Sequence, residues 1–233
     1  MTKILNSLKG KFIVLDGPDG CGKTVQLELL ATHLANVGID IIQTTDPGGT
    51  NIGNQISNLL KYDARGHMDV TTEVMLFMAS RAQLVAEVVK PALEEGKTIL
   101  CDRFISSTCA YQGSNGYPID KIIELGKLSV GSIWPDITVI IDVPVEKGRE
   151  RTGHKRYQKT KVKHKDANQA YLFENVVADR FDSRTLKYHR KVRKWFLNIG
   201  QYYPGIVKIV NGEADIETVH NRIVQLISEV SST

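Results

Sequence analysis

Residues 15–27 read LDGPDGCGKTVQL, and this stretch decides the fold class. It continues the apolar run KFIVLD (11–16), which predicts a β-strand. It leads into TVQLELLATHLANVG (24–38), whose leucines recur at helical spacing before a final glycine. Three glycines, a proline and two aspartates therefore stand where a strand hands over to a helix. Backbone amides at such a junction can converge on an anion, so the stretch predicts a phosphate-binding loop.

The loop matches the pattern G-x-x-x-x-G-K-[ST] in the strand–loop–helix context that the pattern requires. The residues expected to contact a nucleotide are Gly17, Pro18, Asp19, Gly20, Cys21, Gly22, Lys23 and Thr24. Glycine lets the main chain approach a phosphate closely, and the helix N-terminus adds partial positive charge. Lys23 brings a full charge to the outer phosphates, and Thr24 offers a hydroxyl to Mg²⁺. The alternative is a glycine-rich turn without a ligand, but the spacing and context favour a site for ATP or GTP.

Strand-like and helix-like runs alternate along the rest of the chain. The further runs that predict strands are 39–44, 97–102, 137–143 and 205–211. Helices are expected near 70–95, 119–130, 171–199 and 214–230, with Pro91 kinking or splitting the first. Nearly continuous apolar strands between helices predict an α/β, three-layer fold with a parallel sheet of about five strands. We expect one domain over residues 1–233, with a lid at about 147–180.

The bulk composition restricts the class of protein without naming a function. Hydrophobic residues make up 42% of 233 residues, enough for a sizeable core. No run of about eighteen apolar residues predicts a membrane span. The N-terminal MTKILNSLKGKF does not read as a signal peptide. Three widely spaced cysteines favour reduced thiols, so we expect a cytoplasmic protein.

The basic residues are concentrated in one segment. Residues 147–165, KGRERTGHKRYQKTKVKHK, carry nine Lys or Arg and one Glu, about +8, whereas the whole chain carries +4. The rest of the chain is therefore acidic overall. A solvated loop, a lid that closes over phosphates and a nucleic-acid patch are all compatible with such a segment.

The strand KTILCD (97–102) ends on Asp102, at the expected carboxyl edge of the sheet. A carboxylate there can hold Mg²⁺ directly or through water. A carboxylate that caps the following helix is the alternative. Together with Thr24, Asp102 is the candidate metal ligand.

Three more stretches narrow the class of P-loop protein: DPGGTNIG (46–53), MLFMASRAQL (75–84) and DRFISSTCAYQG (102–113). An N-K-x-D segment for guanine recognition is missing after the late strand, where the chain reads VIIDVPVEKG. With the P-loop, these stretches resemble the thymidylate kinase family, P-loop enzymes that phosphorylate thymidine monophosphate. The resemblance runs from residue 11 to about 143 and resumes at DRFD (179–182).

The resemblance implies ATP and dTMP as substrates, Mg²⁺ as cofactor and a set of acceptor-site residues. These residues are Phe77, Arg81, Arg103, Thr108, Tyr111 and Gln112, with Asp19 near the acceptor phosphate or sugar. Phe77 and Arg81 lie four apart on a helix, so one face could stack a pyrimidine and bond its edge. Without the resemblance, Phe77 would read as core and Arg81 as a surface charge. Arg103 has the planar fork that suits a monophosphate.

The family supplies a transfer arginine from the P-loop or from the lid, and this P-loop has none. The candidates in the basic segment are Arg149, Arg151 and Arg156, each of which could instead only solvate the lid. Lys23, Arg103 and Asp19 complete the expected catalytic set. Asp179 and Arg180 could pair to organise the lid. The resemblance also implies a homodimer through the helix at 70–95. The acidic remainder of the chain, and a basic segment with no interleaved aromatic beyond Tyr157, argue against a nucleic-acid partner.

Two departures from the family pattern keep alternatives open. The sequence at this position in the family is usually R-E-P-G-G-T, but this chain has Thr45 and Asp46 before PGGT. An arginine that helps to bind the acceptor phosphate in the family is therefore missing. The lid is also longer than expected, with an insertion before DRFD. A kinase for another pyrimidine monophosphate such as dUMP, or an ATP-dependent nucleic-acid-binding module, therefore stays open at this point.

Overall fold

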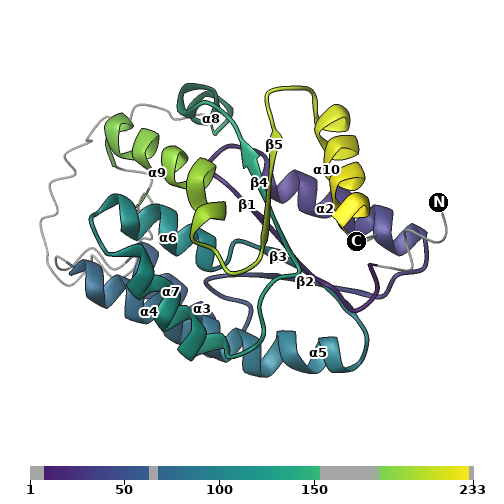
Figure 1. The fold of residues 1–233 in the computed structure, drawn as a ribbon, viewed down its shortest axis with the longest axis horizontal. Coiled ribbons are helices and arrows are strands. Elements are labelled where there is room, and N and C mark those ends of the chain that lie inside the picture. The colour runs from purple at the N-terminus through teal and green to yellow at the C-terminus, as the bar shows by residue number, and fades with distance from the viewer. Residues whose placement is uncertain (1–7, 63–67, 153–180, 182–183, 231–233) are drawn as a thin grey trace, which may run out of the picture.

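The computed structural model describes residues 8–62, 68–152, 181 and 184–230, drawn in colour in Figure 1. Most of the expected lid, residues 153–180 with Arg156, lies outside the described residues. Within them, five parallel strands form one sheet in the order β2-β3-β1-β4-β5. The strands are β1 (Phe12–Asp16), β2 (Ile41–Thr45), β3 (Thr98–Asp102), β4 (Ile137–Asp142) and β5 (Ile206–Asn211). The expected parallel sheet is confirmed.

Helices cover both faces of the sheet, which gives three layers (Figure 1). One face carries α2 (Lys23–Asn36) and α10 (Ile216–Val230). The helices on the other face are α4 (Val70–Leu84), η1 (Val85–Val89), α5 (Lys90–Glu94), α6 (Ile105–Ser114), α7 (Ile119–Val130) and α9 (Leu186–Asn198). Helix α3 (Asn51–Tyr62) packs beside α4.

The central strand β1 explains why the strands read as continuous apolar runs. All five of its residues are buried. Phe12 and Val14 enter the core under α4, α6 and α9, whereas Ile13 and Leu15 enter the core under α2 and α10. A strand with helices on both faces has no solvent side, so alternation is lost.

Pro91 interrupts the long helix, as expected, through a π-helical turn. The segment predicted over 70–95 forms α4, then η1, then α5. The amide of Lys90 donates to the carbonyl of Val85, a spacing of five residues. Proline has no N–H to continue the ladder and its ring crowds the preceding turn, so the helix widens locally.

Several boundaries differ from expectation because capping residues set them. The 46–53 stretch is not all loop: α3 begins at Asn51, where the Thr50 hydroxyl accepts a bond of 2.9 Å from the Gly53 amide. Helix α9 begins at Leu186, within the helix expected near 171–199, after Thr185 as N-cap. Two shorter elements are α8 (Val145–Arg151) and the 3₁₀ turn η2 (Ile199–Gln201). None of the helices in the described ranges has the length and apolarity to cross a membrane.

Three neighbouring strands deliver the motif residues to one rim of the sheet. Strand β1 ends at Asp16, directly before the P-loop. Strand β3 pairs with it and ends at Asp102, and β2 pairs with β3 and ends at Thr45. Ligands of open α/β sheets bind outside the carboxyl ends of the strands, so this rim is the candidate site.

Candidate active site

Two cavities open at this rim and share three residues. The P-loop cavity is lined by residues of the P-loop and α2, by Arg151 and Thr152, and by the turn before α10. The adjoining cavity is lined by residues of the β2 and β3 ends and of α3, α4 and α6. Asp19, Asp102 and Arg103 line both. The geometry therefore places two ligand sites end to end, with one carboxylate–arginine cluster between them.

The P-loop has the backbone that its glycines allow. Gly17, Gly20 and Gly22 have φ values of 140°, 73° and 99°, in the region that favours glycine. The Lys23 ammonium is buried and donates to the carbonyls of Gly17 and Pro18, each at 3.0 Å. Of the eight predicted residues, those that line the P-loop cavity are Asp19, Gly20, Cys21, Gly22, Lys23 and Thr24. Gly17 and Pro18 instead accept hydrogen bonds from Lys23.

The P-loop also touches helix α8 backbone to backbone. A Cβ added to Gly20 would lie 2.0 Å from the carbonyl oxygen of Gly148, and one added to Gly148 would lie 2.5 Å from that of Asp19. Neither position has room for any other residue. The start of the basic segment is thus in direct contact with the phosphate-binding loop.

Arg103 stands at the junction of the cavities in a left-handed conformation, with φ 70°. Its Nη2 donates to Asp19 Oδ1 at 2.5 Å, and its Nη1 donates to Ser107 Oγ at 3.0 Å and lies 3.5 Å from Asp16 Oδ1. Its guanidinium lies 5.3 Å from the centroid of the Tyr111 ring. These contacts hold the Arg103 guanidinium beside the P-loop, at the junction of the two cavities.

The two aspartates beside Arg103 are in different electrostatic environments. Asp16 is fully buried, and burial raises its pKa although Arg103, Lys23 and the hydroxyls of Ser106 and Ser107 favour the charge. Burial also acts against the charge of Asp19, but Arg103 and Lys23 outweigh it and lower the pKa of Asp19. Asp19 therefore stays ionised at neutral pH at the point where the cavities meet.

Arg81 is buried in an ion pair. It is 1% exposed, and its Nε and Nη2 contact Asp46 Oδ2 at 2.7 and 2.5 Å. Nη2 also donates to Thr108 Oγ1 at 3.1 Å, and the guanidinium lies 5.2 Å from the centroid of the Phe104 ring. Arg81 is thus not the surface charge that its sequence position alone would indicate. It is fixed, with Thr108, in the wall of the adjoining cavity.

An aromatic wall and an amide complete the adjoining cavity. Phe77 is half-buried, and its ring centroid lies 6.1 Å from that of Phe181. Tyr111 lies at the same distance from Phe181 and donates from Oη to Asp19 Oδ2 at 2.7 Å. Gln112 is fully buried; its Nε2 donates to Glu73 at 2.9 Å, whereas its Oε1 has no hydrogen-bond partner among the described residues. All six predicted acceptor residues line this cavity.

The donor set at the rim fits a magnesium ion. Asp102 Oδ1 is buried without a hydrogen-bond partner in the described part of the chain, and Asp102 lines both cavities. Thr24 is exposed in the P-loop cavity. The described residues hold no cluster of three or more His, Cys, Asp or Glu that could cage a metal. Mg²⁺ bound with nucleotide phosphates needs only one or two such protein oxygens.

The three candidate lid arginines lie in different places. Arg151 lines the P-loop cavity and donates to the carbonyl of Gly212 at 3.0 Å. Arg149, in the last turn of α8, does not line either cavity at the rim. Arg156 lies outside the described residues.

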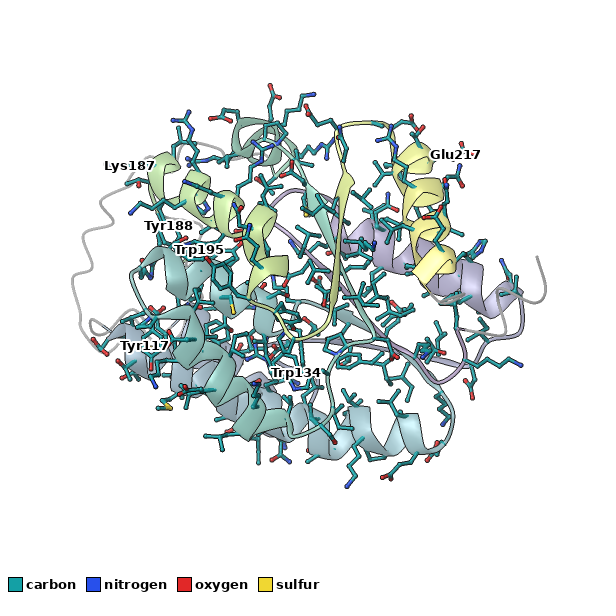
Figure 2. All side chains as sticks on the ribbon, viewed as in Figure 1. Tyr117, Trp134, Lys187, Tyr188, Trp195 and Glu217 are labelled. Atoms are coloured by element: carbon teal, nitrogen blue, oxygen red, sulfur yellow. The ribbon has the colours of Figure 1, made fainter. Side chains whose placement is uncertain are left out.

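Sequence reasoning missed several residues that the structure brings to the site. Asp16 was read as the end of a strand, Asp46 only as a departure from a motif, and Lys61, Phe181 and Arg184 received no role. Arg184 lies between the rings of Phe181 and Tyr188 and donates to Asn115 Oδ1 at 2.7 Å. Tyr188, labelled in Figure 2 on α9, donates to the carbonyl of Tyr111.

The strand order, the P-loop and the second cavity at the sheet rim define a P-loop NTPase with room for another ligand beside the nucleotide phosphates. The family model described as thymidylate kinase matches residues 15–223. The chain belongs to the thymidylate kinase family.

Individual relatives agree with this assignment. A thymidylate kinase from Trichormus variabilis is 38% identical over 221 residues, which cover 94% of this chain and 96% of the relative. One from Limosilactobacillus fermentum is 37% identical over 214 residues, 91% of this chain and 92% of the relative. The crystal structure of thymidylate kinase from Ehrlichia chaffeensis is similar with a TM-score of 0.69 at 28% identity, covering 94% of this chain and 98% of that chain.

Proposed function

We propose that the protein transfers the γ-phosphoryl group of ATP to dTMP and forms ADP and dTDP. The observation that carries this proposal is the pair of cavities that meet at Asp19, Asp102 and Arg103. ATP would lie in the P-loop cavity and dTMP in the adjoining cavity. The chain would act as one domain, with residues about 147–180 as its lid.

The transfer step needs positioning and charge compensation rather than a general base. An oxygen of the dTMP phosphate, already ionised at neutral pH, forms a bond to the γ-phosphorus while the bond to the β–γ bridging oxygen breaks. The electron pair of that bond leaves with ADP. Arg103 can hold the acceptor phosphate from the junction, because its guanidinium is aimed there by Asp19 and Ser107.

Lys23 would stabilise the outer phosphates of ATP once its bonds to Gly17 and Pro18 are exchanged for phosphate oxygens. Thr24 and Asp102 would hold Mg²⁺. Mg²⁺ supplies charge neutralisation across the β- and γ-phosphates when bound. The unpartnered Asp102 Oδ1 supports that assignment.

The adjoining cavity matches the polar edge of a thymine. Phe77 would stack on the ring, and Arg81, held by Asp46, would donate to a carbonyl. Gln112 lines this cavity with a buried Oε1 that has no hydrogen-bond partner among the described residues, and the N3–H of thymine is a donor. Thr108 would contact the base, and Tyr111, fixed by Asp19, would face the sugar and disfavour a 2′-hydroxyl.

The remaining assignments concern the lid and the assembly. Arg149, Arg151 and Arg156 would be the lid cations, and Arg151 has support from its place in the P-loop cavity.

A homodimer would use α3 and α4, where Ile52, Leu59 and Met75 are exposed. The apolar residues of α4 and η1 that sequence reasoning offered for that interface are mostly core, since Val74, Met78 and Val85 are buried. Three buried free cysteines support a reducing cytoplasm.

A coupled assay of ADP release with dTMP, dUMP, dCMP, dGMP and UMP tests the proposal. We expect kcat/KM to be highest for dTMP by at least about tenfold, because loss of one pocket methyl contact costs about 1–3 kcal/mol. Equal or better turnover of dUMP would instead favour the other pyrimidine kinase. Salt-sensitive DNA binding without turnover would favour the nucleic-acid module. The reported relatives give no support to either alternative.

A further inference from the structure

Lys61 is a cation of the adjoining cavity that has no partner in the described part of the chain. It lies in the last turn of α3 and lines the cavity. Its neighbour Leu60 is fully buried, whereas Lys61 is half-buried. A lysine in a last turn complements the helix dipole, which accounts for the residue type. It does not account for a side chain that lines a ligand cavity.

The other cations of this cavity are already neutralised. Arg81 is paired with buried Asp46 through two contacts. Arg103 lies between Asp19 at 2.5 Å and Asp16 at 3.5 Å. Both arginines keep N–H groups that can bind a ligand, but their charges are balanced by the carboxylates beside them. Lys61 is the one lining cation of the described residues without such a carboxylate.

A phosphate that enters this cavity also meets carboxylates. Besides Asp46, which is paired with Arg81, Asp19 and Asp102 line it, and Arg103 and Lys23 lower the pKa of Asp19 against the effect of burial. A phosphate dianion beside ionised carboxylates is repelled unless an uncompensated cation is close. Arg103 alone cannot supply that excess charge, because it already serves two carboxylates.

The end of β2 cannot supply the charge either. Thr45 lines the same cavity as a neutral side chain, and its hydroxyl donates to the carbonyl of Asp102 at 3.4 Å. A hydroxyl offers one hydrogen bond and no charge. The positive charge for the acceptor phosphate must come from another element, and among the described lining residues α3 provides it.

We propose that Lys61 binds the phosphate of the acceptor nucleotide, taking the place of a cation at the end of β2. The inference rests on the proposed function, since it assumes a nucleoside monophosphate in the adjoining cavity. It adds a specificity residue that distinguishes the monophosphate from the bare nucleoside. Lys61 is a flexible point charge, so it would set acceptor affinity rather than the geometry of transfer.

Calorimetric titration of Lys61→Met with dTMP and with thymidine tests the proposal. We expect the Kd for dTMP to rise about 10–100-fold, the range of one charge-assisted contact, while the Kd for thymidine stays within about twofold. KM for dTMP should rise in parallel, with kcat at saturating dTMP changed by no more than about threefold. Lys61→Arg should keep most of the affinity. Lys90→Met, an exposed lysine on α5 distant from the lining, is the matched control.

A rescue variant separates charge from shape. Thr45→Arg in the Lys61→Met background returns a cation to the cavity, and we expect it to recover dTMP affinity without changing thymidine affinity. Equal losses for dTMP and thymidine would overturn the proposal, because Lys61 would then serve the nucleoside. Unchanged dTMP binding in Lys61→Met would also overturn it. A wild-type protein that binds no dTMP would refute the proposed function itself, and that result is seen before any variant is made.

Discussion

The P-loop cavity and the adjoining cavity meet at the same rim, but they are built in different ways. The P-loop cavity takes its largest continuous part from one stretch, Asp19 to Gln26, which brings backbone amides and one lysine. The adjoining cavity collects side chains from segments between residues 19 and 181. Backbone binding depends on local glycines, whereas side-chain binding depends on tertiary packing.

The polar side chains of the two cavities also differ in how they are held. Lys23 donates to the Gly17 and Pro18 carbonyls and to the Cys21 sulfur of its own loop, so a phosphate can replace those bonds at small cost. Arg81 is fixed by a buried carboxylate, and Arg103 by two carboxylates and a hydroxyl. The adjoining cavity is thus pre-organised for a ligand of defined shape, whereas the P-loop cavity suits a polyphosphate chain. Substitutions should therefore separate into effects on kcat and effects on acceptor binding.

The largest effect is expected for Lys23→Ala. Loss of the charge on the outer phosphates should lower kcat about 10²–10³-fold, as for removal of one group that stabilises transition-state charge. KM for dTMP should change little, because Lys23 does not line the adjoining cavity. Steady-state assays against Lys97→Ala, a partly exposed lysine paired with Glu95, would check it. A KM effect on dTMP larger than the kcat effect would contradict the division between the cavities.

Arg103→Ala should come next and should affect both parameters, since Arg103 lines both cavities. We expect kcat to fall about 10²-fold and KM for dTMP to rise. The substitution removes a donor that stabilises the developing charge and, with it, a group that binds the acceptor phosphate. Arg103→Lys should recover little, as an ammonium cannot bond Asp19 and Ser107 while it reaches a phosphate. Full recovery with lysine would mean that only charge matters at the junction.

This difference between the cavities also decides what the sequence could predict. The P-loop, Asp102 and the five strands follow from local pattern, because glycine spacing and apolar runs act over a few residues. Phe77, Arg81 and Gln112 needed a family resemblance, since no local rule distinguishes a cavity wall from core. The buried pairing of Arg81 with Asp46 joins positions 35 residues apart. Lys61 could not be predicted at all, because only packing brings it to the cavity, and the same holds for Arg184 behind the cavity wall.

Phe77→Ala should act on the acceptor alone. Loss of a stacking platform of about 1–3 kcal/mol should raise KM for dTMP roughly tenfold, with a smaller loss in kcat. KM for ATP should stay unchanged, because Phe77 does not line the P-loop cavity. Phe77→Tyr keeps the ring and serves as the matched control. Unchanged dTMP kinetics in Phe77→Ala would mean that the base lies elsewhere.

The smallest effect is expected for Arg184→Gln, which tests whether the adjoining cavity depends on support behind its wall. Arg184 lies against the rings of Phe181 and Tyr188 and is 3.4 Å from Glu73, the residue that holds Gln112. It does not line the cavity itself.

Because the Arg184 side chain is partly exposed, solvent screens its contacts. We therefore expect KM for dTMP to rise only about threefold in Arg184→Gln, with kcat unchanged. The matched control is Arg190→Gln on the following helix α9, where the arginine pairs with exposed Glu146 and should not affect dTMP kinetics. A drop in kcat for Arg184→Gln would place the residue in the transfer step rather than behind the acceptor site. Equal changes in both variants would show that positive charge in the region of residues 184–190, not the cavity wall, controls acceptor affinity.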